Sequence, residues 1–108
     1  MANSYKFKGV ALATTNETAL LTAASTETII IKSIRVTNNT SNTPTLSFDV
    51  EDSSASAEYT ILKTQTLAAN TAVEILSVPL VLEASDAIKA TISSSDSIHF
   101  GISYMSVT

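Results

Sequence analysis

The chain has 108 residues, of which 44% are hydrophobic and 15% charged, and its mean hydropathy is +0.25, so the composition excludes a disordered tail. This length provides for one domain and no second core. Ten acidic and six basic residues give a net charge of -4, the basic residues are not clustered, and cysteine is absent; nucleic acid as a partner, disulfides and thiolate chemistry are therefore not expected.

Alternating apolar and polar residues, typical of half-buried strands, recur along the chain. Within the predicted strand 28–38, Ile34 and Val36 share a face with Lys32, so a bulge or bend is expected near Lys32. The predicted strand 97–104 directs Phe100 inward and His99 outward. In chain order the predicted strands are 5–12, 18–22, 28–38, 45–52, 57–64, 72–77, 87–93 and 97–104.

Segments 38–44, 53–56 and 93–96 are rich in Asn, Ser and Thr, which favour turns. Segments 19–24 and 66–72 lack the length and the repeated apolar face that a stable helix needs. Residues 1–108 are therefore predicted to form a single all-β domain, an antiparallel β-sandwich with about seven or eight short strands. Jelly-roll and immunoglobulin-like topologies both fit this pattern.

His99, the one histidine, lies near Asp96 and Ser97 and invites comparison with a catalytic triad. On a strand, however, Ser97 and His99 would point the same way about 7 Å apart, beyond hydrogen-bond reach. We therefore expect a surface or interface histidine, and we predict that the protein is not an enzyme.

The densest acidic group consists of Asp49, Glu51, Asp52 and the nearby Glu58. Carboxylate oxygens of this kind can hold Ca²⁺, but the segment lacks the alternating acidic positions and the glycine turn of a calcium loop. We expect a solvated strand edge here, and no metal or cofactor is predicted.

Near the N-terminus, Tyr5 and Phe7 alternate with Lys6 and Lys8. Chain ends are usually frayed unless they dock, so residues 1–8 are a candidate docking arm, with Tyr5, Phe7 and Lys8 as its assembly interface. The 32 Ser and Thr residues against 16 charged ones indicate a surface poorly protected against association, which favours a homo-oligomer. A monomer whose Ser and Thr content reflects strand propensity is the alternative.

The C-terminal third carries a resemblance to a known group of proteins. Residues 79–90, PLVLEASDAIKA, followed by 98–107, resemble the ending "PLVLEAGDxIKA" of small structural proteins of tailed bacteriophages that infect cyanobacteria and marine bacteria. Residues 28–39 and 50–54 are similar to the middle of the same proteins. The chain departs from the pattern at Ser85, where glycine is usual, and at Ser106, where an acidic residue is usual. A positive φ before Asp86 would therefore be strained at Ser85.

The resemblance implies a multimeric virion component with a β-sandwich fold and no catalytic residues. We expect a capsid decoration or cement protein, a trimer that clamps neighbouring copies of the phage major capsid protein. A tail, neck or fibre-associated protein is the first alternative. A carbohydrate- or host-surface-binding module is the second, although the chain has no tryptophan to stack on a sugar. The expected location is the virion, after synthesis in the host cytoplasm, because the chain shows neither a signal peptide nor a membrane span.

Overall fold

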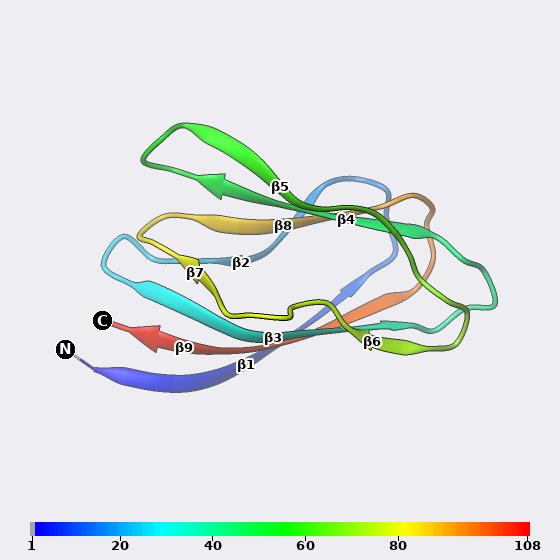
Figure 1. The fold of residues 1–108 in the computed structure, drawn as a ribbon, viewed down its shortest axis with the longest axis horizontal. Helices are drawn as coiled ribbons and strands as arrows, with labels where there is room; N and C mark the ends of the chain where they lie inside the picture. The colour runs from blue at the N-terminus through cyan, green and yellow to red at the C-terminus, as the bar shows by residue number, and fades with distance from the viewer. Residues whose placement is uncertain (1) are drawn as a thin grey trace.

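In the computed structural model, which describes residues 2–108, nine strands form two antiparallel sheets packed face to face (Figure 1). The larger sheet has the order β1-β9-β3-β6, with β7 also paired to β3, and the smaller sheet has the order β2-β8-β4-β5. The strands are β1 (Asn3–Leu12), β2 (Thr18–Thr22), β3 (Thr28–Asn38), β4 (Thr45–Asp52), β5 (Ala57–Thr66), β6 (Ala72–Glu74), β7 (Leu80–Leu82), β8 (Ala87–Ile92) and β9 (Ile98–Val107).

This strand order is a jelly roll, which decides between the two topologies that the sequence leaves open. β6 pairs with residues 35–37 of β3, and β7 pairs with residues 29–31 of the same strand. The two short strands thus occupy the place of one broken edge strand, which accounts for nine strands where seven or eight are predicted. The predicted all-β sandwich is confirmed, and the structure contains no helix that could cross a membrane within residues 2–108.

Most strand boundaries agree with the alternation in the sequence. The predicted strands 18–22, 28–38 and 45–52 coincide with β2, β3 and β4. The register between β3 and β9 shifts between Ile31 and Ser33, which confirms the bulge expected near Lys32. The short strand β7 was not predicted, and the other predicted boundaries differ from the structure by one to three residues. β1 begins at Asn3 rather than at 5, β5 ends at Thr66 rather than at 64, β6 ends at Glu74 rather than at 77, β8 ends at Ile92 rather than at 93, and β9 spans Ile98–Val107 rather than 97–104.

The core lies between the inner faces of the two sheets. Phe48 of β4 and Phe100 of β9 meet across it, with ring centroids 6.0 Å apart and ring planes inclined at 56°. Asn38 is also buried; its Nδ2 donates to the carbonyl oxygen of Asn42 at 2.8 Å, and its Oδ1 accepts from the backbone N–H of Thr40 at 3.0 Å. The largest fully buried side chains are Phe48, Phe100, Leu20, Ile29, Ile31, Ile34, Leu46, Leu82, Ile88, Ile92, Ile98 and Ile102.

The turn between β7 and β8 contains Ser85, one of the two departures from the phage-protein pattern that the sequence resembles. Ser85 has a φ of 69°, so the positive φ considered from the sequence is present, and a serine adopts it. Next to it the buried Asp86 accepts hydrogen bonds from the backbone N–H groups of Ser53, at 2.9 Å, and Glu83, at 3.0 Å. This carboxylate therefore ties the β4–β5 turn to the β7–β8 turn.

Candidate assembly surface

β1 is an edge strand with one free side. Ala2 and Thr108 exchange both backbone hydrogen bonds, each at 2.9 Å, and β1 pairs with β9 without a register shift. Bonded and non-bonded pairs alternate along an antiparallel ladder. The even-numbered residues of β1 therefore bond to β9. The N–H and C=O groups that point to the free edge belong to Asn3, Tyr5, Phe7, Gly9 and Ala11.

The candidate interface residues of the N-terminus all lie in β1. Tyr5 is 79% exposed and Phe7 is 71% exposed, both on the outer face of the larger sheet. Lys6 and Lys8 occupy the alternate positions and share the inner face with the buried Leu12. Residues 3–8 of the candidate docking arm are thus an integral part of the sheet, and Met1 lies outside the described residues.

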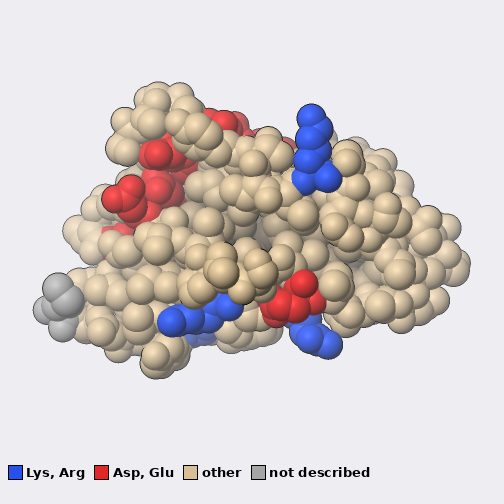
Figure 2. All heavy atoms as spheres, in the orientation of Figure 1, with Lys and Arg blue, Asp and Glu red and all other residues tan. Residues whose placement is uncertain are grey.

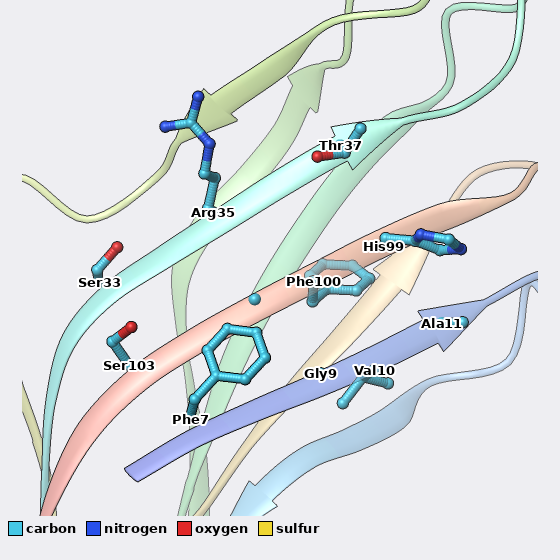
Figure 3. A pocket seen from close by; sticks show the side chains of 11 residues that line it. Phe7, Gly9, Val10, Ala11, Ser33, Arg35, Thr37, His99, Phe100 and Ser103 are labelled. Atoms are coloured by element: carbon cyan, nitrogen blue, oxygen red, sulfur yellow. The ribbon is translucent and has the colours of Figure 1, made fainter. Parts of the chain in front are cut away.

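A shallow groove of about 560 Å³ lies beside Phe7 on the outer face of the larger sheet (Figure 3). Its floor is formed by the only two glycines of the chain, Gly9 and Gly101, which face each other across β1 and β9. Three rows of residues cross the sheet here: Phe7, Ser103 and Ser33; Gly9, Gly101 and Arg35; Ala11, His99 and Thr37. Small side chains thus surround an aromatic ring, a guanidinium group and an imidazole.

Arg35 and His99 are the charged and titratable residues of this groove, and both are exposed. Within residues 2–108, the only ion pairs are those of Lys89 with Glu17 and Glu51. No carboxylate in this range therefore lies within 4.0 Å of the Arg35 guanidinium group. Figure 3 shows Arg35 and His99 rising from neighbouring strands, with Phe7 on the far side of β9 from Arg35. The groove can therefore receive an anionic or a hydroxyl-rich group.

The structure does not assemble a triad around His99. The buried Asp96 carboxylate instead accepts hydrogen bonds from the hydroxyl of Ser94 and from Nδ2 of Asn42, the latter at 2.8 Å. These two hydrogen bonds, that of Ser94 first, lower the pKa of Asp96. Among the described residues no hydrogen bond joins His99 to Asp96 or Ser97, so Asp96 orders the loop before β9.

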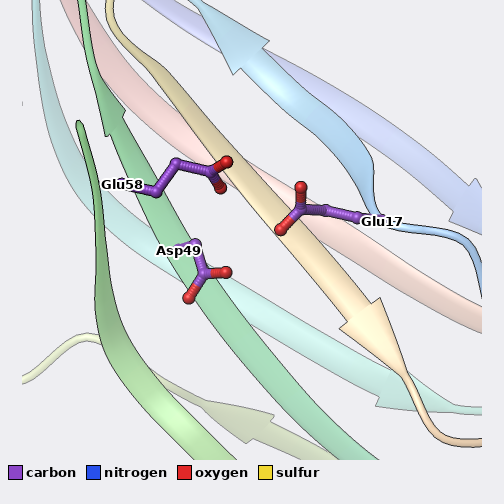
Figure 4. A group of neighbouring side chains, drawn as sticks. All are labelled: Glu17, Asp49 and Glu58. Atoms are coloured by element: carbon purple, nitrogen blue, oxygen red, sulfur yellow. The ribbon is translucent and has the colours of Figure 1, made fainter. Parts of the chain in front are cut away.

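The smaller sheet carries an acidic cluster on its outer face (Figure 4). Carboxylate oxygens of Glu17, Asp49 and Glu58 all lie within 4.8 Å of one another. The Nζ of Lys89 lies 3.1 Å from a Glu51 carboxylate oxygen and 3.9 Å from one of Glu17. Partial loss of hydration raises the pKa of Glu17, and the adjacent Asp49 and Glu58 carboxylates act in the same direction.

This cluster differs from the acidic group picked out in the sequence. Asp49 and Glu58 belong to it, whereas Glu51 turns to Lys89, and Asp52 accepts from the Ser54 hydroxyl at 2.9 Å in the β4–β5 turn. Glu17 was missed because no spacing in the sequence places it beside Asp49. Only the order β2-β8-β4 brings them together. Figure 2 shows most of the visible acidic side chains gathered toward the β4–β5 turn, with one acidic group apart from them at the lower centre of the view.

The three carboxylates of this cluster supply the oxygen atoms that a hard cation prefers. Lys89, however, already provides a positive charge beside them through its contacts with Glu17 and Glu51. One ammonium group therefore faces four carboxylates, those of Glu17, Asp49, Glu58 and Glu51, so the cluster keeps a net negative charge. The solvated strand edge without a metal stays a prediction.

No protein-family model matches the sequence, and no curated protein matches it significantly. The fold is nevertheless similar to those of several solved structures. A chain in the structure of infectious bursal disease virus, Gx strain, matches with a TM-score of 0.61 at 10% identity; the match covers 96% of this chain and 32% of that one, so this chain spans about a third of its length.

Two further solved structures match over most of both chains. One comes from Bacillus endospore appendages, which form a family of disulfide-linked pili; the TM-score is 0.56 at 8% identity, covering 96% of this chain and 85% of that chain. The other is the nucleoplasmin-like N-terminal domain of Drosophila FKBP39, with a TM-score of 0.52 at 18% identity, covering 93% and 87%. At these identities the likeness concerns the fold alone.

Proposed function

We propose that this chain is a structural protein of a tailed-bacteriophage virion, and that it serves there as a capsid decoration or cement protein. The observation that carries the proposal is the free edge of β1, where Tyr5 is 79% and Phe7 is 71% exposed. A large aromatic side chain exposed on an edge strand promotes aggregation of a free monomer, whereas in an interface its burial stabilises the complex. The jelly-roll fold and the resemblance of residues 79–90 to phage structural proteins support the same assignment.

The clamping mechanism requires only buried area and backbone pairing. A neighbouring major capsid protein that adds a strand to β1 satisfies the free N–H and C=O groups of Tyr5, Phe7 and Gly9. Its side chains cover the two exposed aromatic rings at the same time. The proposal assigns no catalytic step to the chain, which agrees with the engagement of Asp96 by Ser94 and Asn42.

The proposed homo-oligomer, a trimer, needs a second surface. A groove of about 230 Å³ lies between β5 and the segment that joins β6 to β7. It is lined by Ile61, which is 41% exposed, and by Val78, which is 68% exposed, beside Pro79. Light scattering on the purified chain tests this contact: Val78→Glu should reduce a trimer to a monomer, whereas Lys63→Glu, on β5 but outside the groove lining, should leave it intact.

The experiment that tests the function is the copy number of the chain relative to the major capsid protein in purified particles, measured by quantitative mass spectrometry. A ratio near one, or a sizeable simple fraction of it, supports a place on the capsid lattice. A much smaller number of copies points to the neck, tail or fibre instead. Absence from the particle would overturn the virion assignment.

A carbohydrate- or host-surface-binding module is the second candidate function. It is favoured by the groove around Gly9 and Gly101, where Phe7, Arg35 and His99 stand among serine and threonine hydroxyls. A glycan array distinguishes the two functions. Saturable binding to one class of sugar, lost in Phe7→Ala and kept in Tyr59→Ala, would favour this module over the cement protein.

A further inference from the structure

The edges of the two sheets differ in how well they are protected against pairing. β5 is interrupted by two register shifts against β4, and its Thr64 has a φ of 50°. β2 has five residues and a register shift, and β6 and β7 have three residues each. β1 has ten residues and no shift, so among residues 2–108 it is the one long, regular edge. Bulges and short strands protect an edge, and β1 has neither device.

A strand added to β1 presents its side chains alternately to two different surfaces. On the outer face they lie beside the exposed rings of Tyr5 and Phe7. On the inner face they lie beside Lys6 and Lys8, which are both exposed. The outer face therefore favours apolar side chains at every second position of the added strand. At the positions between, the inner face favours side chains that can lie beside the two lysines.

The charge on the inner side of this edge is positive. Within residues 2–108, neither Lys6 nor Lys8 has a carboxylate within 4.0 Å. Lys6 interacts with Glu27 through a weaker, longer-range charge interaction, and the Glu27 carboxylate already accepts from the Ala24 backbone N–H at 3.0 Å and from the Ser106 hydroxyl. The two lysines therefore lack a close counter-charge, and an acidic side chain opposite each of them stabilises the pairing.

A second copy of β1 does not meet this requirement. Antiparallel pairing of two copies about Phe7 places Lys6 of each copy opposite Lys8 of the other. Like charges directly opposite each other destabilise a strand pair. In this register the lysines act against self-pairing, and β1 itself carries no acidic residue that could stand opposite them in any register, so the edge stays open to an acidic strand.

We infer that the edge of β1 receives an extended segment of another protein in which acidic and apolar residues alternate. The acidic side chains face Lys6 and Lys8, and the apolar ones pack beside Tyr5 and Phe7. Only the identification of that protein as the phage major capsid protein rests on the proposed function. The recognition chemistry depends on the purified chain alone and is tested without particles.

The test uses the full chain and ten-residue peptides that alternate valine with glutamate, with valine–lysine peptides as the matched probe. Fluorescence anisotropy should show saturable binding of the glutamate peptide and about tenfold weaker binding of the lysine peptide. The double variant Lys6→Glu/Lys8→Glu should reverse this preference. The control Lys63→Glu, a charge reversal on the bulged edge β5, should leave it unchanged.

Amide hydrogen exchange locates the peptide. In the free chain the amides of Tyr5, Phe7 and Gly9 should exchange fast and those of Lys6 and Lys8 slowly, because the latter bond to β9. The glutamate peptide should slow the first three. Failure of these amides to become protected, or a charge preference that survives Lys6→Glu/Lys8→Glu, would overturn the inference even if the chain is found in the virion. Protection with the expected reversal would support it even if the chain is absent from the particle.

Discussion

The ring of Phe7 lies against Gly101 of the neighbouring strand, and a Cβ placed on Gly101 would stand 3.2 Å from Phe7 Cε1. At Gly9, in contrast, a Cβ would stand 3.6 Å from the same ring, an ordinary van der Waals contact. The absence of a side chain at 101 therefore lets an exposed ring lie over β9, next to the free edge (Figure 3). The side chain of Phe7 is thus directed by a residue 94 positions away in the sequence (101 − 7).

Gly101→Ala should shift the Phe7 ring off β9 while leaving the fold intact, since an exposed side chain can move by the few tenths of an ångström required. The expected loss in the free energy of unfolding is about 0.5 kcal/mol or less. Aromatic NMR signals of Phe7 report the ring, and urea titration reports the stability. Gly9→Ala is the matched control and should alter neither. Unchanged Phe7 signals in Gly101→Ala would contradict the described packing.

Phe48→Ala should lower the free energy of unfolding by about 3–5 kcal/mol, because it opens a cavity against Phe100 in the middle of the core. Phe7→Ala removes the same side chain from an exposed position and should cost about 0.5 kcal/mol or less. Urea unfolding of both variants checks the contrast. Equal losses would mean that Phe7 is buried in the purified protein, as it would be in a tight oligomer.

Ser85→Gly should raise the free energy of unfolding by about 0.5–1 kcal/mol, because a serine at a φ of 69° is strained and glycine is not. Ser97→Gly makes the same exchange at an exposed residue without a positive φ, and it should lower the stability instead. Thermal and urea unfolding measure both. A stabilising effect of Ser97→Gly equal to that of Ser85→Gly would rule out relief of backbone strain as the cause.

Glu27 should contribute to acid sensitivity. The Ala24 backbone N–H, followed by the Ser106 hydroxyl, lowers the pKa of Glu27 below its usual value of 4.5. Because the folded state binds this proton more weakly than the unfolded state, the contribution is present above 4.5 and is lost as the pH falls through the lower pKa of the folded state.

Urea unfolding as a function of pH measures this contribution. In Glu27→Gln, the loss of stability on acidification should be smaller than in the unchanged chain, because the titrating group is gone. Glu83→Gln, an exposed carboxylate in the β7–β8 turn, serves as the control. An identical pH dependence for the Glu27→Gln variant and the unchanged chain would refute the role of Glu27.

Asp49→Asn should lower the pKa of Glu17, because the Asp49 carboxylate is one of the causes that raise it. Carbon NMR of the side-chain carboxyl groups follows the titration directly. Asp52→Asn, which alters a carboxylate that faces Ser54 in the turn, should leave the titration of Glu17 unchanged. If neither variant moves the pKa of Glu17, the three carboxylates are farther apart in solution than described.

Much of this fold follows from the local alternation of apolar and polar residues along the chain. A period of two predicts which residues face inward, and β2, β3 and β4 begin and end where the alternation does. The bulge at Lys32 is visible because the apolar phase changes there. The positive φ at Ser85, in contrast, was suggested by the resemblance to phage proteins that have glycine at this place, and the alternation does not show it. The strand faces and the bulge depend on neighbouring residues, so the chain alone reveals them.

Pairing between distant strands decided the rest. The jelly-roll order, the meeting of Glu17 with Asp49 and Glu58, and the contact of Phe7 with Gly101 all arise because β8 and β9 lie between strands from the first half of the chain. β7 was missed because its three residues are too few to show an alternation, and only β3 holds them in place. The candidate docking arm is likewise a sheet edge, because β9 pairs with half of the backbone N–H and C=O groups of residues 3–8. Register and neighbour order depend on the packing of the whole core, and no local pattern of side chains encodes them.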